Sequence, residues 1–152
     1  MSKDGKNLKE KTIKLDERNV SITTLIPLWA RAAESRKKDP ILIDPYANKF
    51  VKRIDFDFTK ISDTLGEYGQ LLYPIRAKAF DIILNNFIKR VKNPVVVNLG
   101  AGLDTTCSRI STNEILWFDL DLPEVIKIAK QLVPETRKHR FLSLSVLNYN
   151  WI

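Results

Sequence analysis

Two apolar runs, each followed by a polar turn, constrain the fold of this chain more than any other feature. Val95–Leu99 is apolar except for one asparagine and ends in Gly100-Ala101-Gly102. A second run, Ile115–Leu120, contains Asp119 and is followed directly by Asp121. The two aspartates are 19 and 21 positions after Gly100. Runs of this kind are typical of parallel strands that are covered on both faces. The pattern predicts two neighbouring parallel strands, with a glycine turn at the carboxyl end of the first.

The remaining elements predict an α/β fold. Asp44 and Pro45 form a helix start, because an aspartate caps the helix and proline suits its first position. Pro74 and Pro123 are expected to open helices in the same way. Helices are predicted over residues 21–38, 45–54, 57–65, from 74 onward, 104–110 and 123–133, and a third strand is predicted over 141–146. This order indicates N-terminal helices followed by the first half of a doubly wound, Rossmann-like sheet.

Three segments are expected along the chain. Residues 1–20 are predicted to be a mobile basic arm, residues 21–93 a helical segment, and residues 94–152 the first half of a cofactor-binding α/β domain. A doubly wound sheet normally continues on the other side of its first strand, where ligands bind. We therefore expect a truncated form without its C-terminal half, whose exposed sheet edge is open to oligomerisation.

Composition excludes several other classes of protein. The net charge is +7 and the sequence pI is about 9.5. Basic residues without interleaved aromatic ones indicate solvated helix faces and do not favour a nucleic-acid partner. The chain has no apolar stretch of membrane-spanning length and no secretory signal, so no membrane partner and a cytoplasmic location are expected. Cys107 is expected in the core, and His139, within a basic run, at the surface.

The glycine turn favours a cofactor that contains adenosine but no phosphate. Dinucleotide-binding turns carry a third glycine, where this chain has Thr105. Asp104, which is also expected to cap the next helix, would repel a pyrophosphate at that helix start. S-adenosyl-L-methionine avoids this repulsion because it carries a sulfonium cation. Asp121, or alternatively Asp119, is expected to accept hydrogen bonds from the ribose, although one of the two carboxylates could instead cap the helix at Pro123.

The amino-acid part of such a cofactor requires a cation for its carboxylate. Arginine suits this role because its guanidinium forms two parallel hydrogen bonds with a carboxylate. Arg76 and Arg31 are the candidates. The sequence contains no His, Cys and Asp cluster with the spacing of metal ligands, so no metal site is expected. It identifies no catalytic residue.

Several motifs together resemble the leucine carboxyl methyltransferase family, which includes related bacterial O-methyltransferases of polyketide biosynthesis. The matching segments follow the order of the family along the chain. They are residues 24–32, 44–47, 75–81, 98–105, 117–125 and 143–151. The resemblance implies an S-adenosyl-L-methionine-dependent methyltransferase that acts on a carboxyl or hydroxyl oxygen of a small molecule or of a protein C-terminus.

The resemblance also assigns roles to individual residues. Arg76 falls on the family position that binds the methionine carboxylate, and Asp121 on the acid that holds the ribose. Gly100, with its neighbours Ala101 and Gly102, falls on the glycine turn. Arg31 lies near a basic family position. Ser145 stands where many members have an aspartate near the adenine amino group, so its hydroxyl would be the hydrogen-bond acceptor there.

Three other functions remain open from the sequence. The chain could be a catalytically inactive fragment or an interaction module, because the acceptor half of the site is expected beyond Ile152. A nicotinamide-dependent oxidoreductase would use a similar strand and turn. A nucleic-acid-binding protein would account for the positive charge.

Overall fold

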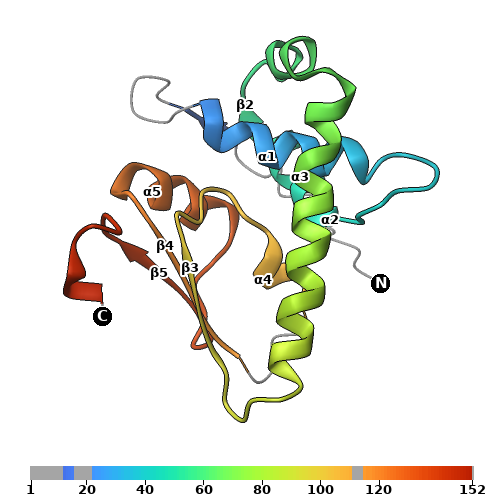
Figure 1. Cartoon of the computed structure of the whole chain (residues 1–152). Helices are drawn as coiled ribbons and strands as arrows, with labels where there is room; N and C mark the ends of the chain where they lie inside the picture. The colour runs from blue at the N-terminus through green and yellow to red at the C-terminus, as the bar shows by residue number, and fades with distance from the viewer. Residues whose placement is uncertain (1–11, 16–21, 111–114, 152) are drawn as a thin grey trace, which may run out of the picture.

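A computed structural model of the chain describes residues 12–15, 22–110 and 115–151. It places a group of helices beside a three-stranded sheet, with α3 along one side of the molecule (Figure 1). The elements are β1 (Ile13–Lys14), α1 (Ile22–Glu34), α2 (Pro45–Arg53), β2 (Ile54–Asp55), α3 (Thr59–Ile88), β3 (Val95–Leu99), α4 (Thr106–Arg109), β4 (Leu116–Asp121), α5 (Pro123–Leu132), β5 (His139–Ser143) and the 3-10 helix η1 (Tyr149–Trp151).

The predicted α/β fold is confirmed. The strands are parallel in the order β3-β4-β5, and α4 and α5 lie in the connections between them. Asn98 of β3 lies beside Asp119 of β4, and Asp121 lies beside Ser143 of β5. β5 begins two residues earlier than predicted and ends at Ser143, because pairing with β4 already starts at His139. The carboxyl ends of β3 and β4 therefore meet at one edge of the sheet.

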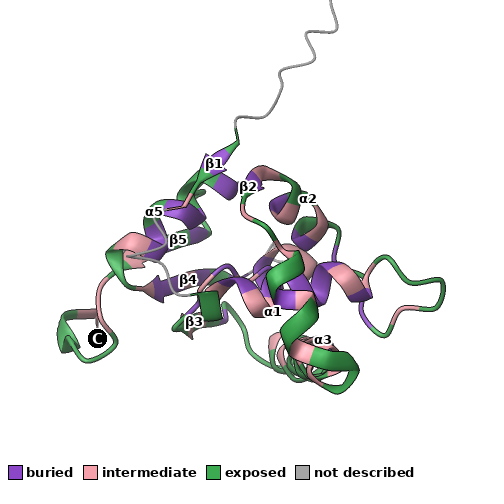
Figure 2. Ribbon diagram, turned by 90° about the horizontal axis from the view of Figure 1, so that it is seen from above, coloured by how far each residue is buried: buried purple, intermediate pink, exposed green. Residues whose placement is uncertain are grey.

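Helices cover one face of this sheet. Trp117 and the partly buried Val96 share an apolar cluster with Cys107 of α4 and Leu84 of α3. Phe141 belongs to a second cluster, which extends to α5, α2 and α1. The register places Val96, Trp117 and Phe141 on the same face, since side chains alternate along a strand. Figure 2 shows buried residues gathered in α1, α5 and β4, whereas α3 is mostly exposed.

The helices differ from the sequence predictions at several places, and α2 ends one residue early, at Arg53. α1 ends at Glu34, not Lys38. The two helices predicted over 57–65 and from Pro74 form one kinked element, α3, because the chain bends at Gly66 (φ 60°, ψ 173°) and is helical again before Pro74. Pro74, inside this element, has no N–H to donate to the preceding turn, so α3 lacks one helical hydrogen bond there. α4 is a single turn that ends at Arg109, one residue short of the predicted end, and α5 ends at Leu132.

Part of the expected N-terminal arm takes a defined place. Ile13 pairs in parallel with Ile54 of β2, and it is buried in the main apolar cluster. The sequence pattern did not predict this short pairing. The rest of the arm predicted over residues 1–20 lies outside the described residues.

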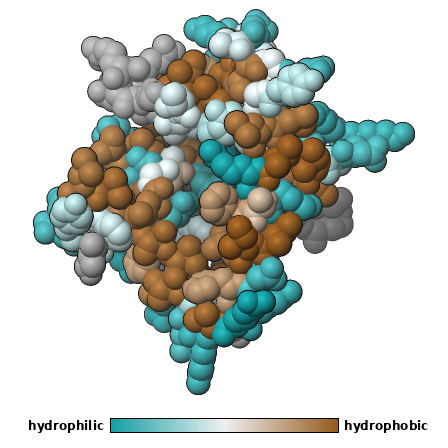
Figure 3. Space-filling model, viewed as in Figure 1, coloured by the Kyte–Doolittle hydropathy of each residue, from teal (hydrophilic) through white to brown (hydrophobic). Residues whose placement is uncertain are grey.

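The opposite face of the sheet is open. Val95, Val97, Leu99 and Leu116 point away from the covered face, and each is between 36% and 53% exposed. β3 is also at the end of the strand order, and no strand of the described residues pairs with its other edge. Apolar side chains gather over α3 and over the strands in the view of Figure 3. Those on α3 are Leu72, Ile75, Phe80, Ile82, Ile83 and Phe87. None of the helices within 12–15, 22–110 and 115–151 has the length and apolar character needed to cross a membrane.

Candidate functional site

A cavity of about 630 Å³ lies at the carboxyl end of β3, between α1, α3 and the glycine turn. Its charged side chains are Arg31, Arg76, Asp104 and Asp121. Gly100, Ala101 and Gly102 also line it, with apolar side chains from α1, α3 and β3. The structure thus brings together six of the eight residues that the sequence predicted for cofactor binding: Arg31, Arg76, Gly100, Ala101, Gly102 and Asp121.

The turn after β3 depends on its two glycines. Gly100 and Gly102 have φ values of 63° and 57°, which side chains of L-amino acids rarely adopt. The carboxylate of Asp121 holds the turn, since its Oδ2 accepts a hydrogen bond from the Gly102 N–H at 2.7 Å. Its Oδ1 accepts one from the N–H of Leu122, also at 2.7 Å. Each carboxylate oxygen still has a second acceptor site, so Asp121 can also receive hydroxyl donors from a ligand.

Arg76 reaches the cavity from the exposed second half of α3. Its guanidinium carbon lies 5.3 Å from the ring centroid of Tyr73, one turn earlier in the helix. A cation above an aromatic face is attracted by the ring, so Tyr73 limits the rotation of this side chain. Sequence reasoning did not identify Tyr73, although its spacing of three positions from Arg76 on a helix was a usable signal.

Arg31 lies at the cavity wall, but the hydrogen bonds of its guanidinium are to protein atoms. Nη2 donates to the carbonyl oxygen of Leu103 at 3.0 Å, and Nε donates to Asp44 Oδ2 at 3.2 Å. Burial lowers the pKa of Arg31, although the nearby Asp104 and Asp44 carboxylates act in the opposite direction. Only 6% of its side chain is exposed. Arg31 therefore stabilises the turn after β3 through its hydrogen bond to the Leu103 carbonyl.

Asp104 also lines the cavity, with its side chain 24% exposed. Its carboxylate accepts a hydrogen bond from Asn98 Nδ2 at 3.2 Å and lies 3.9 Å from Arg31 Nη2. The prediction that Asp104 caps the next helix is wrong: Thr105 is the N-cap residue of α4, without a side-chain cap bond. Asp104 therefore leaves a negative charge at the cavity.

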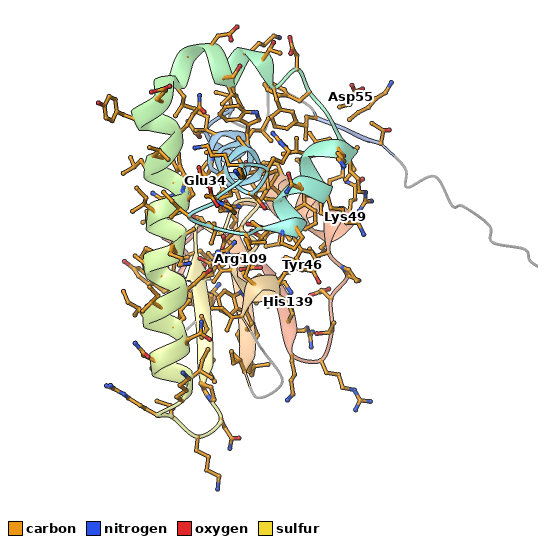
Figure 4. All side chains as sticks on the ribbon, turned by 90° about the vertical axis from the view of Figure 1, so that its right-hand side faces the viewer. Glu34, Tyr46, Lys49, Asp55, Arg109 and His139 are labelled. Atoms are coloured by element: carbon orange, nitrogen blue, oxygen red, sulfur yellow. The ribbon has the colours of Figure 1, made fainter. Side chains whose placement is uncertain are left out.

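Arg109 of α4 lies beside α3 in the interior of the molecule (Figure 4). Its Nε and Nη2 donate to the two oxygens of Asp81, both at 2.9 Å. Nη1 donates to Asp44 Oδ2 at 2.7 Å and to Thr105 Oγ1 at 2.6 Å, and Nη2 donates to Thr106 Oγ1 at 2.8 Å. Burial tends to lower the pKa of Arg109, but the hydrogen bond to Asp81 and the charges of Asp44 and Asp81 outweigh it and raise that pKa.

Asp119 lies outside the cavity, in the interior below the turn. Its Oδ1 accepts hydrogen bonds from Trp117 Nε1 at 2.8 Å and from Asn98 Nδ2 at 3.0 Å, and its Oδ2 lies 2.7 Å from His139 Nε2. His139 is 9% exposed, so the expectation of a surface histidine is wrong. The structure thus separates the two aspartates of β4: Asp121 faces the cavity, and Asp119 joins β3 to β5.

Ser145 and Cys107 also lie outside the cavity. The hydroxyl of Ser145 accepts a hydrogen bond from the Leu147 N–H at 3.2 Å, in the segment after β5. Cys107 is 9% exposed, as expected for a core residue. Burial raises the pKa of its thiol to about 12, so it is a poor nucleophile at neutral pH. No group of three or more His, Cys, Asp and Glu side chains suited to a metal ion occurs among the described residues.

Sequence reasoning missed Asn98, Arg109 and the shared role of Asp44. Asn98 donates to both Asp104 and Asp119, and Arg109 joins Asp81 to Asp44. The asparagine did carry a signal, since it interrupts an otherwise apolar strand. Arg109 carried none, because its partner Asp81 is 28 positions away in the sequence.

A Rossmann-like α/β unit with a glycine turn and an acid at the end of its second strand is the arrangement typical of cofactor-binding domains. A sequence profile of the leucine carboxyl methyltransferase family matches residues 24–141. The chain belongs to this family.

Individual relatives agree with that assignment. The tetracenomycin polyketide synthesis O-methyltransferase TcmP of Streptomyces glaucescens is 32% identical over 131 residues, which are 86% of this chain and 48% of the relative. The S-adenosyl-L-methionine-dependent methyltransferase dpfgK of Gibberella zeae is 28% identical over 142 residues, with the same coverage of 86% and 48%. The chain spans about half the length of these curated relatives.

Proposed function

We propose that the cavity binds S-adenosyl-L-methionine and that the whole protein transfers the methyl group of this cofactor to an oxygen atom. One observation carries the proposal: Arg76 of α3 and Asp121 of β4 line the same cavity as the glycine turn, although they are 45 positions apart in the sequence. Family membership and the names of the relatives support the cofactor.

The charges of the cavity suit each part of this cofactor. Arg76 can bind the methionine carboxylate, because a guanidinium pairs well with a carboxylate. Asp104 places a negative charge where a cationic ammonium or sulfonium group would be stabilised. Asp121 can accept hydrogen bonds from the ribose hydroxyls while it holds the Gly102 N–H. The apolar side chains of the cavity suit an adenine ring.

The nicotinamide alternative is less compatible with the turn. A pyrophosphate would lie near the carboxylate of Asp104. The position of the missing third glycine holds Thr105, whose hydroxyl is buried and bonded to Asp44. Calorimetry with S-adenosylhomocysteine and with NAD separates the two functions. We expect saturable binding of S-adenosylhomocysteine only, and binding of NAD alone would contradict the proposal.

Replacing Asp121 by alanine should weaken binding of S-adenosylhomocysteine by about 1–3 kcal/mol, because ribose hydroxyls lose their acceptor and the turn loses a support. Titration calorimetry measures this loss. Glu124, three positions later in α5, does not line the cavity, so Glu124→Ala is the control and should leave the affinity unchanged. An unchanged affinity in Asp121→Ala would mean that the ribose does not contact this carboxylate.

The acceptor is proposed only as a class. Methyl transfer from a sulfonium carbon requires chiefly that the two reactants be held in line, so the protein contributes mostly positioning. The O-methyltransferase name of TcmP supports an oxygen acceptor, either a hydroxyl or carboxyl group of a small molecule or a protein C-terminal carboxylate. Because the chain spans about half the length of its relatives, we propose the methyltransferase activity for the whole protein and not for this chain by itself.

The open face of the sheet supports a proposal about association. The unpaired edge of β3 and its exposed apolar residues favour pairing with a second copy of this chain. Replacing Val95, which is 53% exposed, by lysine should weaken self-association about tenfold or more, since a buried valine contributes more than 1 kcal/mol. Sedimentation measures the effect. Ile43→Lys is the control, because Ile43 is 70% exposed in the loop before α2. Equal effects of both variants would contradict this interface.

A further inference from the structure

The helix that carries Arg76 has few buried contacts. Among the residues of α3, only Ile61 and Pro74 are buried, and both precede Arg76. The half of α3 after Arg76 contributes only the partly buried Leu84 and Ile88 to the apolar cluster at the sheet. Because few apolar side chains of α3 beyond Arg76 pack against the rest of the protein, a polar contact in this half adds to what fixes the position of Arg76.

Asp81 provides that contact, five positions after Arg76. Its side chain is 15% exposed, and both of its oxygens accept hydrogen bonds from Arg109, at 2.9 Å each. Two parallel hydrogen bonds between planar groups set both the distance and the rotation of the helix that carries the carboxylate. The Arg109–Asp81 pair therefore restrains α3 in both respects.

Arg109 is itself held rigidly from the side of the glycine turn. Its five N–H groups all have acceptors, namely two on Asp81 and one each on Asp44, Thr105 and Thr106. Only 5% of its side chain is exposed. Thr105 directly follows the cavity residue Asp104 and also donates its hydroxyl to Asp44. A continuous chain of hydrogen bonds thus joins the end of the turn to α3.

We propose that Arg109 is a positioning residue, which fixes Arg76 relative to the glycine turn by holding Asp81. This role rests on the proposed function, because Arg76 is taken to bind the cofactor carboxylate. Arg109 itself does not line the cavity. It acts on the ligand only through α3.

Arg109→Lys tests the role because lysine keeps the charge but cannot form the planar pair. We expect the affinity for S-adenosylhomocysteine to fall about tenfold, because one charge-assisted hydrogen bond contributes about that factor to binding. The affinity for 5′-methylthioadenosine, which lacks the carboxylate, should change by less than about twofold. A merely structural role would weaken both ligands equally, and that result would overturn the proposal.

The matched control is Arg53→Lys. Arg53 also joins two elements, since its Nη2 donates to the Gln131 carbonyl of α5 at 2.9 Å, but it does not line the cavity. This variant should leave both affinities unchanged. If Arg109→Lys does not fold, Asp81→Asn replaces it, because it removes the charge from α3 and leaves Arg109 its bonds to Asp44 and the two threonines.

A second measurement needs no ligand. Spin labels on cysteines introduced at the exposed Ala79 of α3 and Lys127 of α5 report the distance between these helices. Cys107 should not compete for the label, because it is buried and its pKa is about 12. We expect a broader or shifted distance distribution in Asp81→Asn than in the parent, and an unchanged distribution would overturn the proposal. A parent that fails to bind S-adenosylhomocysteine would contradict the proposed function, whereas the spin-label distances would still test the Arg109–Asp81 pair.

Discussion

Replacing Asp44 by alanine is expected to lower the free energy of unfolding by about 3–5 kcal/mol, the usual cost of removing one partner of a buried ion pair. Asp44 is 0% exposed, and its Oδ2 accepts hydrogen bonds from Arg31 and Arg109. Its Oδ1 caps α2 by accepting from the Ala47 N–H at 2.8 Å. Without this carboxylate, two buried guanidinium groups lose a counter-charge and a helix loses its cap. Urea denaturation measures the change.

Two further variants make this result specific. Asp39→Ala changes an exposed aspartate in the preceding loop and should leave stability nearly unchanged. Asp44→Asn keeps a side-chain oxygen for the cap but removes the charge. Its loss in free energy of unfolding should therefore lie between those of Asp39→Ala and Asp44→Ala. A loss below about 1 kcal/mol in Asp44→Ala, the range of an exposed pair, would show that the two arginines do not depend on Asp44.

Replacing Arg76 by alanine is expected to weaken binding of S-adenosylhomocysteine by about tenfold to a hundredfold, since hydrogen bonds to a charged group contribute roughly 1.5–3 kcal/mol. Arg76 lines the cavity and stacks on Tyr73, so its guanidinium is partly ordered before a ligand arrives. Binding of 5′-methylthioadenosine should be nearly unaffected, because this ligand has no carboxylate. Titration calorimetry with both ligands measures the difference.

The control for Arg76 lies on the same helix. Lys78 is exposed and does not line the cavity, so Lys78→Ala removes a positive charge from α3 without touching the site. It should leave both affinities unchanged. If Arg76→Ala weakens both ligands equally, Arg76 does not bind the carboxylate and instead shapes the cavity as a whole.

Local patterns predicted the framework of the cavity well. The apolar run of β3, the glycines after it and the acid at the end of β4 were all identified from spacing, because strand periodicity and positive φ leave signals in neighbouring residues. The capping of α2 by Asp44 was also correct, since the cap and the N–H it accepts from are three positions apart. Element bounds were less accurate where a non-local pairing or a bend sets them, as in β5, which begins where it pairs with β4, and in α3, which continues through the bend at Gly66.

The sequence was sufficient to identify the α/β order of the elements, the glycine turn and the family, because each depends on residues close together in the chain. It was not sufficient to identify which charged side chains are buried or which partners they contact. Arg31 was expected to bind a ligand carboxylate, Arg109 was left without a role and His139 was expected at the surface, and each is buried beside a carboxylate. Their partners are 13, 28 and 20 positions away. Electrostatic pairing acts through space, so only the folded packing of helices on the sheet shows which charges meet and which face the cavity.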